Sequence, residues 1–347
     1  MTSSPTYHLF VGIDIAAATF TATWTRQGAP TQRPATFAQA PEGFATLQQR
    51  LQATGVAPAA TLIVLEATGS YWITLATTLH AAGYAISVIN PAQAHHFAKA
   101  LLKRAKTDAI DAATLAQLAA LLQPAPWTPP PAIYHELQQR LAQRDALVAM
   151  RGQVRNQLHA LIQGPVVIAA VRARMEALIA TLTQQIAEVE REIGDALCLD
   201  AAWAAAAERL QSIKGIGLLT AGWLLVTTLN FQQCATPEQA AAYAGLVPVE
   251  GRSGTSVWKR PSIGHRGNAR LRTALYMATV SATQHNPVIK TFYERLRAAG
   301  KLEKVARCAA ARKLLHIAWA VATKERRFDP SFQPVSSHVA IPQQLGA

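Results

Sequence analysis

The strongest constraint on this chain is a run of five prolines within residues 123–132, QPAPWTPPPA. Proline fixes its own φ and has no backbone N–H group, so such a segment is extended and stiff and ends any helix or sheet that reaches it. Strand-like and helix-like patterns alternate before this segment, whereas long helical patterns dominate after it. The sequence therefore predicts an α/β part followed by a mostly helical part.

Residues 7–120 show this alternation in detail. Apolar or alternating runs predict five strands, and stretches with helical spacing predict helices between them. The strand-like runs are YHLFVGIDIA, TFTATWTR, PATFAQA, TLIVLEATG and YAISVINP, and the helical ones are PEGFATLQQRLQAT and YWITLATTLHAAG. The first three strands follow one another closely, so we expect a meander within a mixed sheet that helices cover.

Two long helical patterns lie beyond the prolines, before a basic helical region. The second carries a seam of apolar residues spaced 3, 4, 4, 3, 4 and 4 apart: Met175, Leu178, Leu182, Ile186, Val189, Ile193 and Leu197. This spacing is typical of a coiled coil, and it fits an intrachain helical hairpin as well as a contact between subunits. We place the α/β domain at 1–122, the linker and long helices at 123–204, the basic domain at 205–330 and a tail at 331–347.

Positive charge is concentrated in one part of the chain. The formal net charge is +13, and residues 251–330 hold 17 lysines and arginines against 4 acids, a net +13 in that segment alone. The remaining 16 basic and 16 acidic residues cancel. A local excess of this kind predicts a surface that binds a polyanion such as nucleic acid.

The three cysteines, Cys198, Cys234 and Cys308, have no C-x-x-C spacing, so we expect reduced, buried thiols and neither a zinc site nor a disulfide framework. We see no signal peptide and no apolar stretch of about 18 residues, so we expect no membrane span and a cytoplasmic protein. No phosphate-loop motif is present, so we expect no ATP requirement.

Four carboxylates stand where predicted elements begin or end. Asp14 and Glu66 each end an apolar strand. Asp108 and Asp111 lie three residues apart at the start of a helical pattern, where they also complement the helix dipole and where Thr107 or Asp108 is a suitable N-cap. Neighbouring strand ends form sites in α/β sheets, and four carboxylates that converge there need a cation such as Mg²⁺. The joint pattern favours a metal site over separate caps and surface charges.

The basic region contains a short stretch, GRSGTS at 251–256, that we interpret as a loop. Taken alone, it fits a phosphate-binding loop without chemistry, because a serine needs an activating partner and His265 is better suited to phosphate or solvent. Upstream, SIKGIGLLTA at 212–221 looks like a helix-hairpin-helix element, whose glycine turn lets backbone N–H groups hold a phosphate. We expect nucleic acid to contact these residues: Lys103, Arg104, Lys106, Lys214, Gly215, Gly217, Arg252, Lys259, Arg260, Arg266, Arg270 and Arg272.

Several motifs occur together in a fixed order. They are VGIDIA, LEATGSYW, VINP and KTDAIDA before the prolines, and AGLVP, SGTS and LRTALYM after them. With these motifs the chain resembles the Asp-Glu-Asp-Asp transposases of bacterial insertion sequences (insertion sequence family 110) over roughly residues 7–330. The resemblance implies a ribonuclease-H-like (RuvC-like) first domain. It also implies that Asp14, Glu66, Asp108 and Asp111 hold Mg²⁺ or Mn²⁺ at DNA.

The same resemblance assigns a role to the serine stretch. It implies that Ser253 is a recombination nucleophile, with Ser256 as the second choice. VWKR follows the stretch where the family commonly has a small, glycine-containing basic segment, which leaves the contacts of Trp258 open.

The activity implied is that of a transposase that exchanges strands of donor and target DNA through a 5′-phosphoserine intermediate. An element-encoded non-coding (bridge) RNA would choose both DNAs by base pairing. The resemblance also implies a homo-oligomer, dimer or tetramer, at the nucleoid, in which one subunit's metal domain completes the serine site of another. The alternatives are a metal-dependent, structure-selective nuclease that uses water, and a non-catalytic nucleic-acid-binding protein. The residues by themselves support a metal and nucleic acid.

Overall fold

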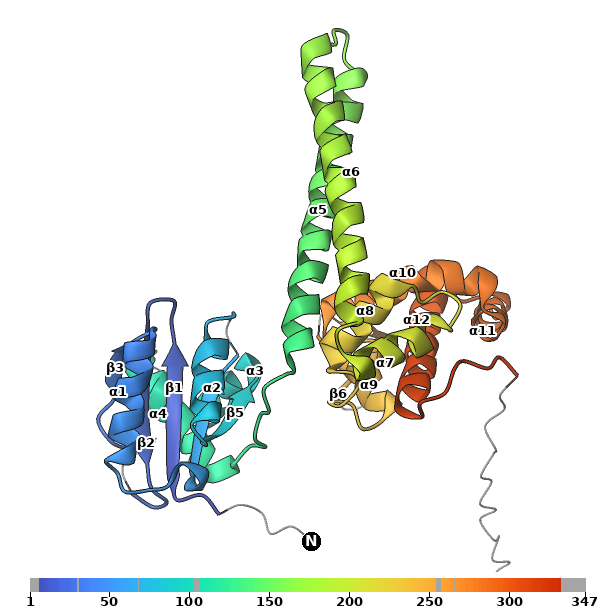
Figure 1. Cartoon of the computed structure of the whole chain (residues 1–347). Helices are drawn as coiled ribbons and strands as arrows, with labels where there is room; N and C mark the ends of the chain where they lie inside the picture. Colours follow the sequence, from blue (N-terminus) through green and yellow to red (C-terminus); the bar gives the residue numbers. More distant parts are fainter. Residues whose placement is uncertain are drawn as a thin grey trace, which may run out of the picture. The chain divides into compact units, whose positions relative to one another are not determined.

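The structure is a computed structural model that describes residues 6–29, 31–67, 69–102, 107–253, 257–264 and 266–331. The chain divides into two compact units, Met1–Pro129 and Pro130–Ala347, so the division falls within the proline run (Figure 1). The long helices and the basic helices belong to the same unit. The finer boundaries at 122, 204 and 330 stay predictions.

The first unit contains a five-stranded sheet in the order β3-β2-β1-β4-β5. β1 pairs antiparallel with β2, as β2 does with β3, whereas β1 pairs parallel with β4, as β4 does with β5. The strands are β1 (Leu9–Ile15), β2 (Thr19–Thr25), β3 (Ala35–Ala38), β4 (Thr61–Glu66) and β5 (Ala85–Ile89). The predicted meander and mixed sheet are confirmed.

Helices cover both faces of this sheet. They are α1 (Pro41–Gln52), the 3-10 helix η1 (Pro58–Ala60), α2 (Trp72–Ala81), α3 (Pro91–Ala100) and α4 (Asp108–Leu122). One core joins α1 and α2 to side chains such as Val11 and Ile63, and the other joins α3 and α4 to the alternate side chains Phe10 and Val64. Successive strand residues point to opposite faces, so β1, β4 and β5 each contribute to both cores.

Helix α4 lies directly on β1. A Cβ atom added at Gly12 would stand 2.1 Å from the carbonyl oxygen of Ala112 and 2.2 Å from the backbone nitrogen of Ala116. Only a residue without a side chain fits this contact, which explains a glycine inside an otherwise apolar strand. The contact seats the helix across the strand two residues before Asp14.

The proline segment begins as part of the first unit. Between α4 and the next helix, residues 123–131 form no helix or strand, as predicted. The backbone N–H of Trp127 donates to the carbonyl oxygen of Ile86 at 2.5 Å, and its ring meets that of Trp72 edge-on at 5.4 Å. Trp127 therefore fastens the first half of the segment to the sheet.

The second unit is mostly helical and holds a two-stranded antiparallel sheet. Its elements are α5 (Ala132–Ile162), α6 (Ala169–Leu197), α7 (Ala201–Gln211), α8 (Leu218–Thr228), α9 (Pro237–Tyr243), β6 (Val249–Ser253), β7 (Val257–Ser262), α10 (Ala269–His285), α11 (Pro287–Ala298) and α12 (Glu303–Thr323). One core joins the start of α5 and the end of α6 to α7–α12. In the part of the chain that the structure describes, no helix has the length and apolar character needed to cross a bilayer.

Helices α5 and α6 form the long antiparallel pair seen side by side in Figure 1. The apolar seam of α6 is buried within the chain only from Leu182 onward, whereas Met175 is partly exposed and Leu178 is 47% exposed. The intrachain hairpin thus accounts for the inner part of the seam. It leaves the outer part uncovered.

The three cysteines, which were predicted to be buried, differ in their exposure. Cys234 is buried and Cys308 partly buried, but Cys198 is exposed, so the prediction of burial is wrong for Cys198. Cys198 is the C-cap of α6, one position beyond the buried Leu197, where the chain turns away from the core. All three are free thiols, and burial raises the pKa of Cys234, which lowers its reactivity.

The contact at Gly12 gives a first prediction. Gly12→Ala places a methyl group against the α4 backbone, so we expect the free energy of unfolding to fall by about 1–3 kcal/mol, measured by urea denaturation. The matched control is Gly152→Ala in α5, where an added Cβ meets no atom within 4 Å and where alanine should stabilise by about 0.5–1 kcal/mol. Wild-type stability of the Gly12 variant would mean that α4 is not seated there.

Candidate carboxylate cluster and serine hairpin

Two carboxylates of the cluster come from the parallel strands β1 and β4. Asp14 follows Phe10 and Gly12 on alternate positions, and Glu66 follows Val64 in the same way, so both lie on the sheet face that α4 covers. Ile13 pairs with Leu65 in the register, which makes the two strand ends neighbours. Strand alternation and register thus bring both carboxylates to one end of one face.

The other two carboxylates come from the first turn of α4. The Thr107 hydroxyl accepts the Ile110 backbone N–H at 3.3 Å and caps the helix, so Thr107 is the N-cap of the two candidates that the sequence offered. Asp108 and Asp111 occupy the following turn, immediately before Ala112, whose carbonyl oxygen faces Gly12. Asp108 is exposed and Asp111 is partly buried. Seating α4 on Gly12 therefore places this turn beside Asp14.

The electrostatics of Asp14 report the same proximity. Burial raises the pKa of Asp14, and the negative charges of Asp108, Asp111 and Glu66 raise it further, to about 6 from an ordinary 3.8. All three of the other predicted carboxylates thus act on Asp14, which a scattered set of caps and surface charges would not do.

The cluster has oxygen donors only, the type that Mg²⁺ and Mn²⁺ prefer. Within the described ranges, however, no three acidic, histidine or cysteine side chains converge closely enough to hold a metal ion. The residue types fit a divalent cation, and binding one requires the carboxylates to move closer together. The basic residues expected beside them, Lys103, Arg104 and Lys106, lie outside the described residues.

The raised pKa predicts a pH-dependent stability in chelator. Ionised Asp14 opposes folding, so its penalty is absent near pH 4 and complete above about pH 6. We expect Asp14→Asn to match the wild type near pH 4 and to exceed it at pH 7–8. A shift of this size corresponds to at most about 3 kcal/mol, and solvent screening at this partly buried site reduces the expected gain to about 1 kcal/mol.

The measurement is urea unfolding in EDTA from pH 4 to pH 8. Glu42→Gln replaces an exposed carboxylate of the same unit and should change the unfolding free energy by less than about 0.5 kcal/mol. A gain for Asp14→Asn that is equally large at pH 4 would show that charge repulsion is not its cause.

The serine stretch lies partly in a hairpin, not wholly in a loop. Gly251–Ser253 belong to β6, and Ser253 is its last residue, paired with Val257 at the start of β7. The predicted loop is wrong for 251–253, because these residues pair across to the next strand. Ser256 and His265 lie outside the described residues. Arg252 lies on β6, and Trp258, Lys259 and Arg260 lie on β7.

Two glycines allow the chain segments on either side of this hairpin to pack backbone against backbone. A Cβ atom added at Gly245 would stand 2.2 Å from the carbonyl oxygen of Arg266, and one added at Gly267 would stand 2.6 Å from the backbone nitrogen of Gly245. Both glycines have positive φ, +69° and +86°. The backbone N–H of Asn268 donates to the Tyr243 carbonyl oxygen at 2.7 Å. We call residues 243–245 and 266–268 the hairpin base.

Arg272 ties the two sides of the hairpin base together. Its Nη1 donates to the carbonyl oxygens of Ala244 at 3.2 Å and Arg266 at 3.0 Å. The guanidinium expected to contact nucleic acid is therefore engaged inside the protein. The sequence showed only a basic residue in a basic region, because its two partners lie 28 and 6 positions away.

Arg270 is likewise engaged within the protein. Its Nη2 donates to Asp145 of α5 at 2.8 Å, and its guanidinium carbon lies 4.5 Å from the ring centroid of Trp223 in α8. Arg144, next to Asp145, pairs with Glu190 of α6 at 2.7 Å. This network joins α10 to the start of the long helical pair, so Arg270 has its charge matched without a phosphate.

The glycine turn at 212–217 connects α7 and α8. Gly215 has φ +104°, and a Cβ atom there would stand 2.6 Å from the Cβ of Ala282 in α10. Asn286 donates to the Lys214 carbonyl oxygen at 3.2 Å, while the Lys214 side chain is exposed. Gly217 is the N-cap of α8, and nothing lies within 4 Å of an added Cβ. Phosphate binding by this turn stays a prediction.

The hairpin base gives a testable prediction. Arg272→Ala removes two hydrogen bonds from a charged donor, so we expect the hairpin to lose about 1.5–3 kcal/mol of local stability. The β6–β7 amides should then exchange with deuterium at least about tenfold faster. Arg272→Lys should restore little, because the lysine side chain is one atom shorter and its ammonium group does not reach both carbonyl oxygens.

The matched control is Arg266→Ala. The side chain of Arg266 is exposed, and the carbonyl oxygen that accepts from Arg272 remains in the variant. Unchanged β6–β7 exchange in Arg272→Ala, or equal acceleration in both variants, would contradict the assigned role.

Comparison with known proteins matches the ranges that contain the carboxylate cluster and the serine hairpin. Residues 11–165 match a family model described as a transposase, and residues 207–294 match one described as transposase IS116/IS110/IS902 family. The pilin gene-inverting proteins of Moraxella lacunata and Moraxella bovis are each 32% identical to this chain over 321 residues, 92% of this chain and 97% of the relative. The transposase for insertion sequence element IS1328 of Yersinia enterocolitica is 27% identical over 274 residues, 70% of this chain and 78% of that protein. The four carboxylates fall within the first matched range and Ser253 within the second.

Proposed function

Because the chain belongs to the IS110 family of insertion-sequence transposases, we propose that it cleaves and exchanges DNA strands with Ser253 as nucleophile and with a divalent cation at the carboxylate cluster. The observation that carries this proposal is the effect of Asp108, Asp111 and Glu66 on Asp14. Two carboxylates at neighbouring strand ends and two in the first turn of α4, with charges that act on one site, are difficult to explain without a cation. Mg²⁺ or Mn²⁺ held there would stabilise negative charge at the scissile phosphate.

The serine chemistry conserves the phosphodiester. The Ser253 oxygen attacks phosphorus, a bond from that oxygen to phosphorus forms, and the bond from phosphorus to the 3′ oxygen of the preceding nucleotide breaks. The serine proton leaves as the 3′-hydroxyl forms, and the 5′ end of the DNA remains on the protein as a phosphoserine. A 3′-hydroxyl from another strand then attacks the phosphoserine, which rejoins DNA and frees the serine. The exchange needs no ATP.

A guide RNA would supply the choice of donor and target sequence, as the family resemblance implies. The net charge of +13 in residues 251–330 supports binding to more than one nucleic acid strand. Lys214 and Arg266 have exposed side chains suited to phosphate contacts, whereas Arg270 and Arg272 are partly exposed and also have hydrogen-bond partners within the protein. Base pairing would read sequence, and the protein would hold the backbone.

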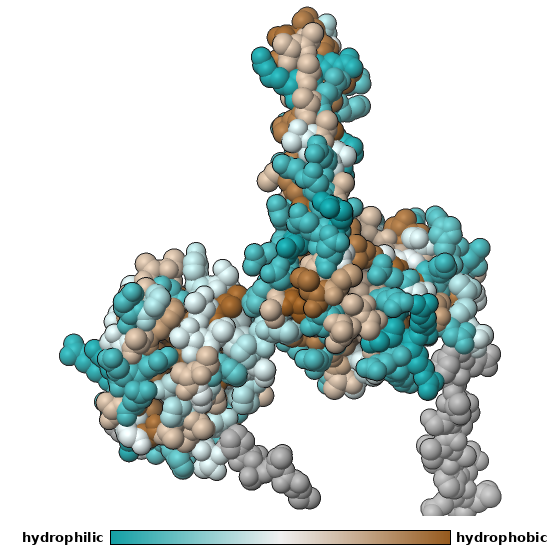
Figure 2. Space-filling model, in the orientation of Figure 1, coloured by the Kyte–Doolittle hydropathy of each residue, from teal (hydrophilic) through white to brown (hydrophobic). Residues whose placement is uncertain are grey.

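A homo-oligomer, dimer or tetramer, completes the proposal. The far end of the long helical pair carries exposed apolar side chains, and Figure 2 shows brown, hydrophobic atoms gathered at that end. The exposed large apolar side chains of this helical pair and of the turn between its helices include Met150, Ile162, Val166, Ile168 and Leu178. Exposed apolar groups of this kind, next to the uncovered part of a coiled-coil seam, support a contact between subunits.

A trapping assay tests the nucleophile. We expect the protein, Mg²⁺, the flanking non-coding RNA of its element and end-labelled junction DNA to give a protein–DNA adduct that survives denaturant. Ser253→Ala should reduce the adduct to background, because no other group would carry the phosphate. Ser262→Ala, an exposed serine at the end of β7, is the matched control and should leave the adduct unchanged. Loss of the adduct in Ser256→Ala instead would move the nucleophile to that serine.

The remaining arms separate the proposal from its alternatives. Omission of the RNA and Asp14→Asn should each abolish the adduct. Cut DNA without an adduct, unaffected by Ser253→Ala, would establish a metal-dependent nuclease that uses water. Binding without any cleavage, unchanged by Asp14→Asn, would reduce the protein to a nucleic-acid-binding role.

A further inference from the structure

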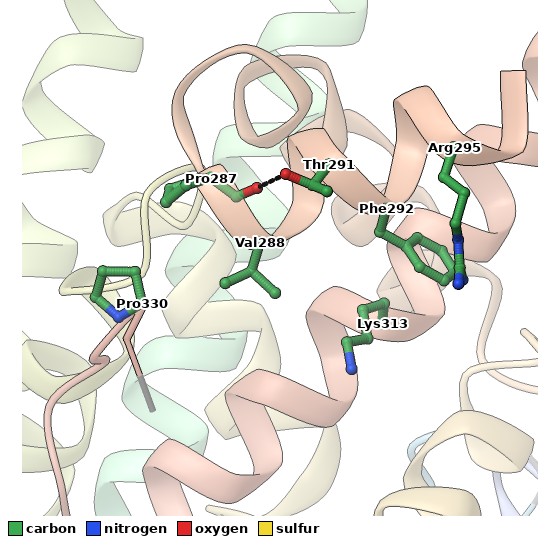
Figure 3. A pocket seen from close by; sticks show the side chains of 7 residues that line it. All are labelled: Pro287, Val288, Thr291, Phe292, Arg295, Lys313 and Pro330. Carbon is green, nitrogen blue, oxygen red and sulfur yellow. Dashed lines mark hydrogen bonds between the residues drawn. The ribbon is translucent and has the colours of Figure 1, made fainter. Parts of the chain in front are cut away.

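The second unit has a hollow that the proposed strand exchange does not use. It holds about 490 Å³, within the range of about 300–1,000 Å³ usual for ligand sites. Figure 3 shows its lining side chains, five from α11, one from α12 and one from the segment after α12: Pro287, Val288, Thr291, Phe292, Arg295, Lys313 and Pro330. All of these residues lie in the strongly basic segment 251–330.

The floor of the hollow is apolar and aromatic. The lining residues of α11 recur at helical spacing on one side, while Ile289 of the same helix is buried in the core. The Thr291 hydroxyl donates to the Pro287 carbonyl oxygen at 2.9 Å, so its proton is directed back into the helix (Figure 3). What remains on this side is the Phe292 ring between Val288 and Arg295.

Two cations border this apolar floor. The guanidinium carbon of Arg295 lies 5.3 Å from the centroid of the Phe292 ring, and the exposed Lys313 of α12 also lines the hollow. Across the described residues, neither cation forms an ion pair, although Arg307 of α12 pairs with Glu303 at 2.8 Å. The nearest acid along the chain to Pro330 is Asp329, whose carboxylate accepts from the backbone and hydroxyl of Ser331.

We infer that this hollow binds one unpaired nucleotide of a single-stranded nucleic acid, with the base against Phe292 and Val288 and the phosphate at Arg295 and Lys313. An aromatic ring beside two cations that lack acidic partners matches a ligand with a flat ring and an anionic group. A base within a duplex is covered by its neighbours, so only an unpaired one can enter. The inference rests on the proposed action on nucleic acid, and it assigns a contact on α11 and α12 for a displaced DNA strand or an RNA loop.

Equilibrium binding of labelled oligonucleotides to the full-length protein tests this site. The probes are oligothymidine, oligouridine, a DNA duplex and, as an acidic peptide, labelled polyglutamate, all measured by fluorescence anisotropy without cleavage. Phe292→Leu keeps an apolar side chain and removes the ring, so we expect single strands to bind at least about fivefold more weakly and the duplex to bind as before. Phe292→Tyr keeps the ring and should bind within about twofold of wild type.

The cations are tested through salt dependence. Arg295→Ala and Lys313→Ala should each lower the slope of log affinity against log salt by about one for single strands. Arg174→Ala removes an exposed arginine of α6 and should leave the slope unchanged. Thermal melting of each variant shows whether it folds. Phe292→Leu and Phe292→Tyr can be compared below the lower of their two melting temperatures.

Each outcome decides the inference. Weaker oligothymidine binding alone identifies a DNA strand as the ligand, weaker oligouridine binding alone identifies RNA, and weaker binding of both supports the shared chemistry. Wild-type binding by Phe292→Leu overturns the inference, as does equal weakening for the duplex or for polyglutamate, which would indicate a general anion surface or an acidic peptide site. If the protein forms the Ser253 adduct but Phe292→Leu binds single strands as the wild type does, this inference is wrong and the proposed function is unaffected.

Discussion

The carboxylate cluster depends on direct contact between the backbones of β1 and α4 at Gly12. With 2.1 Å between an added Cβ and the Ala112 carbonyl oxygen, the helix has a single place at which it can cross the strand. That place lies two residues before Asp14 and one residue after Asp111 along their respective elements. The shift of the Asp14 pKa to about 6 is a consequence, since burial and three carboxylate charges act on it there. Packing and electrostatics are therefore coupled: the contact that stabilises the layers also brings like charges together.

In the second unit, glycines likewise permit a direct contact between backbone segments, at the base of the serine hairpin. Gly245 and Gly267 let two chain segments meet without side chains between them, and Arg272 closes the contact with hydrogen bonds to a carbonyl oxygen on each side. A hairpin of two short strands has little stability of its own. The position of Ser253 thus depends on what holds the ends of its hairpin, and that support comes from α10.

Basic residues of the second unit divide into two groups according to their partners. Arg270 and Arg272 face carboxylates, carbonyl oxygens or a tryptophan ring within the protein, and they connect α10 to its neighbours. Arg295 and Lys313 border a hollow and have no ion-pair partner among the residues described. A net charge counts both groups alike. The second group has no partner of its own among the residues described, so the excess of charge locates a surface without identifying its contacts.

Local patterns determined much of this protein from the sequence alone. Periodicity and the positions of prolines and glycines predicted the five strands, the α/β part before the prolines, a helix cap at Thr107 or Asp108 and the position of each carboxylate at the start or end of an element. These properties depend on residues a few positions apart. Tertiary structure decided the rest. It selected the face on which Asp14 and Glu66 meet α4, drew Gly251–Ser253 into a strand, exposed Cys198 and gave Arg270 and Arg272 internal partners. Each of these depends on a neighbour across a sheet, at a helix end or in a distant element, such as the 125 positions between Arg270 and Asp145, and no local spacing encodes such a contact.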